Sequence, residues 1–296
     1  MPDFDHILSR SITHTKLDET LQSALLNFRL FGNKKGYLHL ENLPIGDIPP
    51  TPMDRATLQK NCTISEHTIL KATAVLGDPI GYIQESNGDI INNFFPQKKH
   101  SKDTNSDSYD CELELHTENA FHTVSPDYLV LLCLRQDPAA EAATFISSID
   151  RIRDHLTPDD IRYFLEEKYN FLSDYCITEK NCRIDINQKQ TVLYGDPDAP
   201  FFRFDPQFMV ARSKSAQMKL EVLRKAAWQV AEPVHMKAGD LLIIDNRKTA
   251  HARSAFSANL DGNDRWMQRT FAVTGYRHYA QKFGKNQRVL DLVTSR

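Results

Sequence analysis

The stretch Glu114-Leu115-His116-Thr117-Glu118 has the alternation expected of a β-strand and carries an imidazole and a carboxylate two residues apart. Side chains at positions i and i+2 of a strand point to the same face of a sheet. His116 and Glu118 are therefore predicted to face one point together, while Leu115 and Thr117 face the opposite side. Such a pair on its own also fits the wet face of a surface strand.

A second histidine, which follows an apolar strand late in the chain, favours a metal site. Residues 239–246 read Gly-Asp-Leu-Leu-Ile-Ile-Asp-Asn, and His251 follows five residues after that segment. Two imidazoles and one carboxylate that leave three coordination positions open form the facial triad of non-haem Fe(II) oxygenases. The sequence therefore predicts an iron site made of His116, Glu118 and His251.

Helices are predicted mainly at the front of the chain. Leucines and phenylalanines at spacings of three and four predict a helix over 17–31, and another is predicted over 65–76. Two further helices are predicted over 158–169 and 215–231. The last helix is expected to bury five side chains: Met218, Leu220, Val222, Leu223 and Trp228.

Strands account for most of the remaining chain. They are predicted over 37–40, 80–84, 90–95, 112–116, 128–135, 144–149, 234–236, 241–245, 250–256 and 267–276, with several short strands between 171 and 204. The strands 80–84 and 90–95 flank the turn Ser86-Asn87-Gly88, as the two strands of a hairpin would. This order favours a mainly β fold with flanking helices, a β-sandwich or jelly roll.

One domain over residues 1–296 is predicted, because no linker divides the chain. Its parts are a helical N-terminal region of about 1–76 and a β core of about 80–276. The segment 96–111 is dense in Lys, Ser, Asp and Asn, and we expect a mobile loop there. Its position just before His116 would suit a lid over the site, and a loop without a role is the alternative.

Composition points to a small-molecule partner. The net charge is −3 and 25% of the residues are charged, so no basic excess predicts nucleic acid or an anionic membrane. The first residues carry acid where a signal peptide carries base, and no apolar run approaches the roughly 20 residues that span a bilayer, so a cytoplasmic location is expected. Five cysteines without a Cys-x-x-Cys pair indicate reduced thiols, and Cys133 is expected in the core. The oligomeric state stays open.

Three groups of residues carry a family resemblance. They are His116-Thr117-Glu118-Asn119-Ala120-Phe121-His122, then Pro126-Asp127-Tyr128-Leu129 with Cys133-Leu134-Arg135, and His251-Ala252-Arg253-Ser254 leading through 261–266 to Arg269. In order and spacing these motifs resemble the clavaminate synthase-like branch of the Fe(II)/2-oxoglutarate oxygenases and, more distantly, taurine dioxygenase. The resemblance is strongest to the free amino-acid hydroxylases for arginine, lysine and asparagine. It implies a double-stranded β-helix, or jelly roll, with the iron between its two sheets.

The resemblance also implies how the metal and cosubstrate are held. His116, Glu118 and His251 match the iron ligands. Arg265 matches the arginine that grips the far carboxylate of 2-oxoglutarate, a task suited to a planar two-pronged donor. Thr144 matches the threonine that supports the same carboxylate.

Further matches concern the substrate. Arg269 matches the arginine that holds the substrate's own carboxylate, and Gln84, together with Glu118, matches the groups that contact its α-amino group. Asp205 and Gln207 resemble the segment that meets the side chain in the arginine and lysine hydroxylases, and lying two apart they are expected to point the same way. An acid in a pocket is costly unless a cation compensates its charge, so lysine or arginine is expected. The alternative is that Asp205 only caps the turn at Pro206. Arginine-specific relatives tend to carry a second acid at the position of Gln207, and its absence here favours lysine, ornithine or a neutral amide over arginine.

The implied reaction uses Fe(II), 2-oxoglutarate and O2, releases succinate and CO2, and hydroxylates an unactivated carbon of a free L-amino acid. The alternatives are a desaturase or cyclising oxidase on the same iron centre and a cupin-like metal-binding protein without oxygenase activity. Arg265 and Thr144 disfavour the cupin-like protein, which needs no 2-oxoglutarate clamp. The amino acid, the carbon that is oxidised and the stereochemistry are not determined by the sequence.

Overall fold

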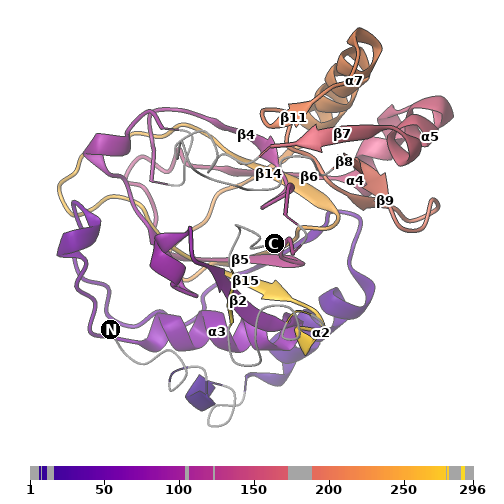
Figure 1. Cartoon of the computed structure of the whole chain (residues 1–296). Helices are drawn as coiled ribbons and strands as arrows, with labels where there is room; N and C mark the ends of the chain where they lie inside the picture. The colour runs from indigo at the N-terminus through magenta and orange to yellow at the C-terminus, as the bar shows by residue number, and fades with distance from the viewer. Residues whose placement is uncertain are drawn as a thin grey trace.

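Two β-sheets form the centre of the molecule in the computed structural model, which describes residues 7, 9–11, 17–103, 107–122, 124–172, 189–277, 279 and 288–290 (Figure 1). The larger sheet has the order β1 (Tyr37–Leu40), β13 (Leu241–Asp245), β5 (Tyr128–Arg135), β15 (Trp266–Val273), β2 (Asp78–Tyr82) and β16 (Val289–Leu290), with β3 (Asn92–Phe94) beside β15. The smaller sheet has the order β12 (Glu232–Val234), β6 (Thr144–Ser148), β14 (Thr249–Arg253) and β4 (Leu113–His116). The pairs are antiparallel except β16 with β2.

The larger sheet is buried on both faces, which explains its nearly continuous apolar strands. Along β13, Leu242 and Ile244 pack into the core shared with the smaller sheet. Leu241 and Ile243 pack on the opposite face, against two N-terminal helices. The alternation of side chains along each strand therefore divides the molecule into two apolar layers.

Helices α2 (Glu19–Phe31) and α3 (Ile64–Leu76) cover the outer face of the larger sheet (Figure 1). The carboxylate of Asp18 accepts hydrogen bonds from the main-chain N–H groups of Thr20 and Leu21 and so caps α2. Both predicted N-terminal helices are confirmed. Their apolar stripes pack on this face of the sheet and bury its apolar side chains.

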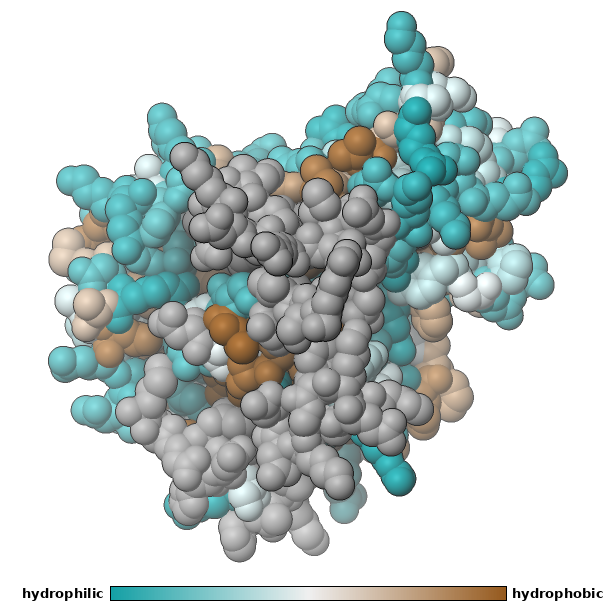
Figure 2. All heavy atoms as spheres, in the orientation of Figure 1, coloured by the Kyte–Doolittle hydropathy of each residue, from teal (hydrophilic) through white to brown (hydrophobic). Residues whose placement is uncertain are grey.

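An insertion between β6 and β12 adds helices and short strands to one side of the molecule (Figure 1). It contains α4 (Ile149–Ile152), α5 (Pro158–Glu166), β7 (Lys168–Phe171), β8 (Lys189–Thr191), β9 (Leu193–Tyr194), β10 (Phe201–Phe202), β11 (Met209–Val210) and α7 (Lys214–Val230). Its outer surface is largely hydrophilic in Figure 2. Short 3-10 helices occur at η1 (Arg55–Thr57), η2 (Ser86–Gly88), η3 (Lys98–His100) and η4 (Arg153–His155).

The structure corrects several details of the sequence prediction. The strands β2 and β3 do not pair as a hairpin but lie one after the other along β15, where Phe271 pairs with Ile80 and Met267 with Phe94. The predicted helix 158–169 ends at Glu166, and its last residues belong to β7. A mainly β fold with helices is confirmed.

Helix α7 buries only part of the predicted set. Leu220 and Leu223 are buried, whereas Met218 is 71% exposed and Val222 is 43% exposed. Met218 and Val222 are four residues apart and share the face that points away from the core. Cys133 is buried as predicted, and burial raises the pKa of its thiol to about 12. In the described part of the chain, no helix is both long and apolar enough to cross a membrane.

Candidate active site

His116 and His251 are neighbours on adjacent strands of the smaller sheet. The β4–β14 register places them directly opposite each other, and their ring centroids are 4.4 Å apart. Glu118 lies two residues beyond the end of β4, and its Oε2 is 3.7 Å from Nε2 of His251. One possible ligand atom from each of the three side chains lies within 4.8 Å of the others. The structure therefore brings the predicted triad together around one point.

The hydrogen bonding of His116 and the burial of His251 suit a metal ion. Nδ1 of His116 is 2.8 Å from the main-chain oxygen of Glu114, and donating there leaves Nε2 as a free ligand. The pKa of His251 lies well below its usual range because the side chain is buried and, secondarily, because His116 and Arg269 are near. Neutral imidazoles and a carboxylate are the forms that bind Fe(II), so these residues fit that ion.

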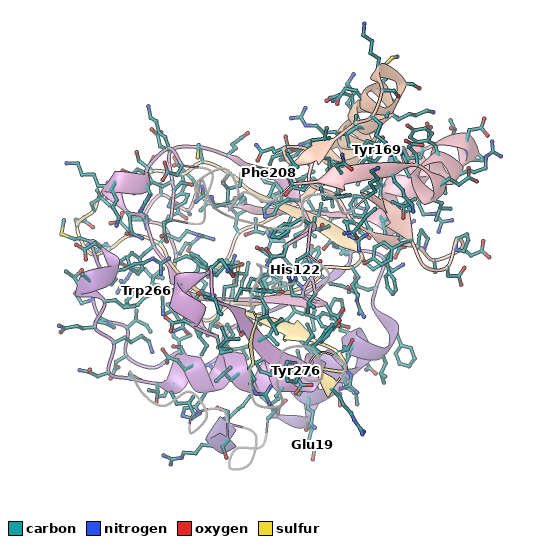
Figure 3. The ribbon with its side chains drawn as sticks, viewed as in Figure 1. Glu19, His122, Tyr169, Phe208, Trp266 and Tyr276 are labelled. Atoms are coloured by element: carbon teal, nitrogen blue, oxygen red, sulfur yellow. The ribbon has the colours of Figure 1, made fainter. Side chains whose placement is uncertain are left out.

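The triad opens into a cavity of about 310 Å³. All of the site residues predicted from the sequence line it: Gln84, His116, Glu118, Thr144, Asp205, Gln207, His251, Arg265 and Arg269. In Figure 3 the side chain of His122 lies between the two sheets, and Phe208, which lines the cavity, lies beside the smaller sheet. Nδ1 of His122 contacts the main chain of Val124, and His122 does not line the cavity.

Arg265 places a guanidinium in the cavity without an ion pair to any acid among the described residues. Its guanidinium lies over the ring of Phe256, 5.5 Å from the ring centroid. Burial lowers the pKa of Arg265, which Cys133 and Asp137 partly offset. A buried cation without a counter-ion is costly, so this position fits an anion. Thr144 is buried and lines the same cavity.

Arg269, by contrast, is held by two acids. It donates to the carboxylate of Glu85, and its Nη1 is 3.5 Å from Oε2 of Glu118. Glu85 is buried and also accepts a hydrogen bond of 3.2 Å from Nδ2 of Asn119. The guanidinium lies 4.5 Å from the ring centroid of Phe94. Glu85 was missed in the sequence, where its only signal is an acid directly after the predicted site residue Gln84.

The segment that carries Asp205 and Gln207 is a turn rather than a strand. The N–H of Phe208 donates to the main-chain oxygen of Asp205 at 3.0 Å, so strand alternation does not apply there. Both side chains nevertheless line the cavity. Gln207 is exposed and Asp205 is partly buried, so Gln207 lies at the mouth.

The cavity wall also includes Asp107, from the segment 96–111. Arg55 of η1 contacts both carboxylate oxygens of Asp107, at 3.0 Å each, and Nε2 of Gln97 donates to the same carboxylate at 2.6 Å. Burial raises the pKa of Asp107, and the positive charge of Arg55 partly offsets this rise. Arg253 donates to the main-chain oxygen of Ser108 and holds this segment against β14. The sequence alone did not single out Arg55 or Asp107, because their contact joins segments about fifty residues apart.

A second group of possible metal ligands, His39, Glu41 and Asp240, lies away from this cavity. Nε2 of His39 is 3.0 Å from Oδ2 of Asp240, and the same oxygen accepts a hydrogen bond from the main-chain N–H of Lys237. Ordinary hydrogen bonds explain why His39 and Asp240 lie together, and Glu41 is exposed, so we do not assign a metal site to this group.

Comparison with protein families and curated proteins agrees with this geometry. The family model described as taurine catabolism dioxygenase TauD, TfdA family matches residues 58–271. Clavaminate synthase 2 of Streptomyces clavuligerus is 30% identical over 267 residues, covering 88% of this chain and 80% of that protein. L-asparagine oxygenase of Streptomyces coelicolor is 29% identical over 267 residues, which cover 87% of this chain and 77% of that protein. L-lysine 3-hydroxylase of Catenulispora acidiphila is 27% identical over 288 residues, which cover 95% of this chain and 80% of that protein.

Solved structures give the same picture. Asparagine oxygenase in complex with Fe(II), 3-hydroxyasparagine and succinate superimposes with a TM-score of 0.84 and 25% identity, covering 97% of this chain and 95% of that one. The non-heme iron oxygenase OrfP in complex with Fe and alpha-ketoglutaric acid superimposes with a TM-score of 0.84 and 27% identity, covering 97% and 90%.

Proposed function

This chain belongs to the taurine catabolism dioxygenase TauD, TfdA family, and from that premise we propose that it hydroxylates a free L-amino acid with a basic side chain, lysine or arginine. It is an Fe(II)/2-oxoglutarate-dependent oxygenase. The observation that carries the proposal is one cavity that joins the His116, Glu118 and His251 cluster to an unneutralised arginine, Arg265.

His116, Glu118 and His251 would hold Fe(II), and Arg265 with Thr144 would bind the far carboxylate of 2-oxoglutarate. When bound, the iron and 2-oxoglutarate use O2 to convert a substrate C–H bond into C–OH, with release of succinate and CO2. The protein supplies position and charge. The guanidinium of Arg265 can meet a carboxylate with two parallel hydrogen bonds, which fixes the cosubstrate's orientation as well as its place.

The two sheets around this cavity are proposed to form a double-stranded β-helix. The wall from β14 carries His251, and the wall from the larger sheet carries Arg269. Residues as distant in sequence as Arg55 and Arg269 line the same cavity, which supports one domain. The segment 96–111 is proposed as a lid, because Asp107 lies in the cavity wall and binds Arg55 of the N-terminal region.

The α-carboxylate and α-ammonium groups of an amino acid have partners of opposite charge in the cavity. Arg269 would bind the carboxylate, and Gln84 with the two acids that contact Arg269, Glu85 and Glu118, would bind the ammonium. In this structure Arg269 and Glu85 neutralise each other. A zwitterion inserted between them would replace that ion pair by two, which keeps both buried charges compensated.

Asp205 is proposed to recognise the basic side chain, with Gln207 at the mouth of the cavity. We expect Asp205→Asn to lower kcat/KM for lysine, arginine or ornithine roughly 10-fold or more, since a hydrogen bond to a charged group contributes about 1.5–3 kcal/mol. The same change should leave turnover of asparagine nearly unaltered. A panel of free amino acids, scored by succinate release and product mass, measures both.

Asp198→Asn is the matched control, because it removes the same charge from an exposed residue outside the cavity. It should not alter the order of substrates. Equal losses for basic and neutral amino acids in Asp205→Asn, or a wild-type preference for apolar or peptide-bound residues, would remove Asp205 from this role.

A further inference from the structure

The two histidines of the triad and its carboxylate are held in different ways. His116 and His251 face each other across the β4–β14 ladder, so the sheet itself fixes their separation. Glu118 lies beyond the last residue of β4 and has no partner in that ladder. The following residue, Asn119, has a φ of 49°, a left-handed conformation that ends the extended run. Arg269 and His251 lie near its carboxylate, but another contact must position its main chain.

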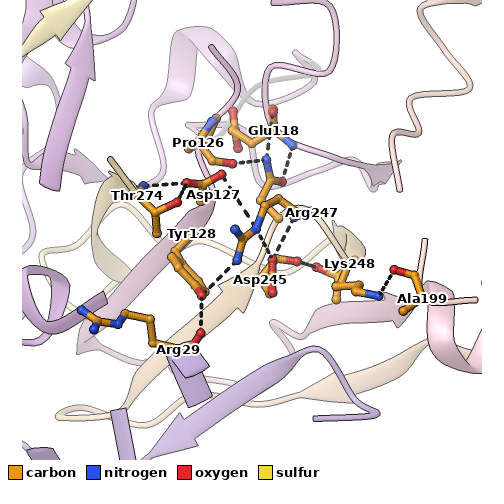
Figure 4. Close-up of polar contacts among 12 residues, drawn as sticks. Arg29, Glu118, Pro126, Asp127, Tyr128, Ala199, Asp245, Arg247, Lys248 and Thr274 are labelled. Carbon is orange, nitrogen blue, oxygen red and sulfur yellow. Dashed lines mark hydrogen bonds and ion pairs between the residues drawn. The ribbon is translucent and has the colours of Figure 1, made fainter. Parts of the chain in front are cut away.

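That contact is the side-chain amide of Asn246. Its Oδ1 accepts the main-chain N–H of Glu118 at 2.7 Å, and its Nδ2 is 3.1 Å from the main-chain oxygen of the same residue. Nδ2 also donates to the oxygen of Pro126 at 2.9 Å. Figure 4 shows the dashed contacts that reach Glu118 and Pro126. Asn246 is only 3% exposed, so water does not compete for these bonds.

The turn that carries Asn246 is itself rigidly anchored. It connects β13 to β14, five residues before His251. Arg247 contacts Oδ1 of Asp245 at 3.2 Å and the hydroxyl of Tyr128 at 3.1 Å (Figure 4). The main-chain N–H of Asn246 donates to the oxygen of Asp127 at 2.9 Å. The amide therefore connects the Glu118 loop to the same turn from which the His251 strand begins.

We propose that Asn246 is a positioning residue for the metal-binding carboxylate, an inference that rests on the proposed Fe(II) site. One amide closes both ends of the loop 118–126 and replaces the missing ladder contacts of Glu118. Partners outside the ligand set that orient a metal ligand typically contribute about 10-fold to 100-fold in metal affinity or activity. Asn246 acts through Glu118 and does not line the cavity.

Two substitutions separate the parts of this contact. Asn246→Ala removes all three hydrogen bonds. Asn246→Asp keeps an acceptor for the N–H of Glu118 but sets carboxylate oxygens against the carbonyls of Glu118 and Pro126, because an ionised carboxylate has no proton to donate. Both variants should therefore loosen Glu118, and Asn246→Asp also adds a buried charge.

The test uses the purified full chain, loaded anaerobically with Fe(II) and 2-oxoglutarate. For both variants we expect the Fe(II) concentration for half-saturation to rise roughly 10-fold to 100-fold. The visible charge-transfer absorption of the Fe(II)·2-oxoglutarate complex should also change. At saturating iron, the 2-oxoglutarate requirement should stay close to the wild-type value, since Arg265 is untouched. Thermal melting of each metal-free variant is recorded beside these measurements.

Arg247→Lys is the matched control. It weakens the same turn but leaves every contact between Asn246 and the Glu118 loop in place. If Arg247→Lys at a similar melting temperature keeps wild-type iron binding and absorption, while either folded Asn246 variant loses them, the inference is supported. If iron binding falls in all variants in proportion to stability, Asn246 is merely structural and the inference is overturned. If the wild-type protein itself does not bind Fe(II) and 2-oxoglutarate, the proposed function is wrong, and the inference on Asn246, which rests on it, is wrong as well.

Discussion

Changing His251 to alanine is expected to abolish turnover and to weaken iron binding by more than the roughly 10-fold to 100-fold typical of an outer partner. His251 is buried opposite His116 and supplies one of three ligands, so its loss leaves an incomplete site. The same result is expected for His116→Ala and Glu118→Ala. Iron content after dialysis and succinate formation with a substrate panel are the two measurements.

His122→Gln is the control for this experiment. His122 is a buried histidine from the loop that follows Glu118, but it does not line the cavity and contacts the main chain of Val124 instead. We expect the His122→Gln variant to bind iron like the wild type. Full activity in all three triad variants would show that the metal site has been assigned to the wrong residues.

Arg265→Ala is expected to raise the half-saturating concentration of 2-oxoglutarate by roughly 30-fold or more. Truncating one partner of a buried, hydrogen-bonded charge pair costs about 2–5 kcal/mol, and each 1.4 kcal/mol corresponds to about tenfold. No acid among the described residues forms a hydrogen bond or ion pair with Arg265, and Asp137, the acid whose charge acts on it, keeps hydrogen bonds from the main-chain N–H groups of Glu141 and Ala142. The loss should therefore fall on the cosubstrate and not on the fold.

Arg269→Lys gives the contrasting result in the same assay. Arg269 contacts Glu85 and Glu118 on the substrate wall, so this variant should raise KM for the amino acid more than for 2-oxoglutarate. If Arg265→Ala kept a normal requirement for 2-oxoglutarate, the clamp would lie elsewhere.

Much of the site could be predicted from the sequence because its members lie at fixed places in strands. Leu115 and His116 alternate along β4, and His251 follows the buried strand β13, so strand periodicity together with the ligand set of an Fe(II) triad located the histidines. The strand β5, predicted over 128–135, is confirmed at those bounds for the same reason. Resemblance to a family supplied Arg265 and Thr144, which no periodicity distinguishes from other polar residues.

The parts that were missed depend on contacts between distant segments. Glu85 is recognised as a site residue from its ion pair with Arg269 of β15, and Asp107 from its contact with Arg55 of the N-terminal region. Neither contact can be inferred from neighbouring residues in the sequence. The pairing of β2 and β3 with β15 was likewise hidden, because a turn sequence between two strands normally indicates a hairpin. Local sequence therefore predicts the helices and strands, whereas the packing of the whole core decides which strands pair and which distant side chains meet.

The most direct test of the central claim is an assay of the wild-type chain with Fe(II), 2-oxoglutarate, O2 and a panel of free amino acids. We expect lysine or arginine to stimulate succinate release most strongly. The product should be heavier than the substrate by one oxygen atom and form in equal amount to succinate. No amino acid raising succinate above the substrate-free level would contradict the account. A product that has lost two hydrogens and gained no oxygen would identify a desaturase or cyclising oxidase instead.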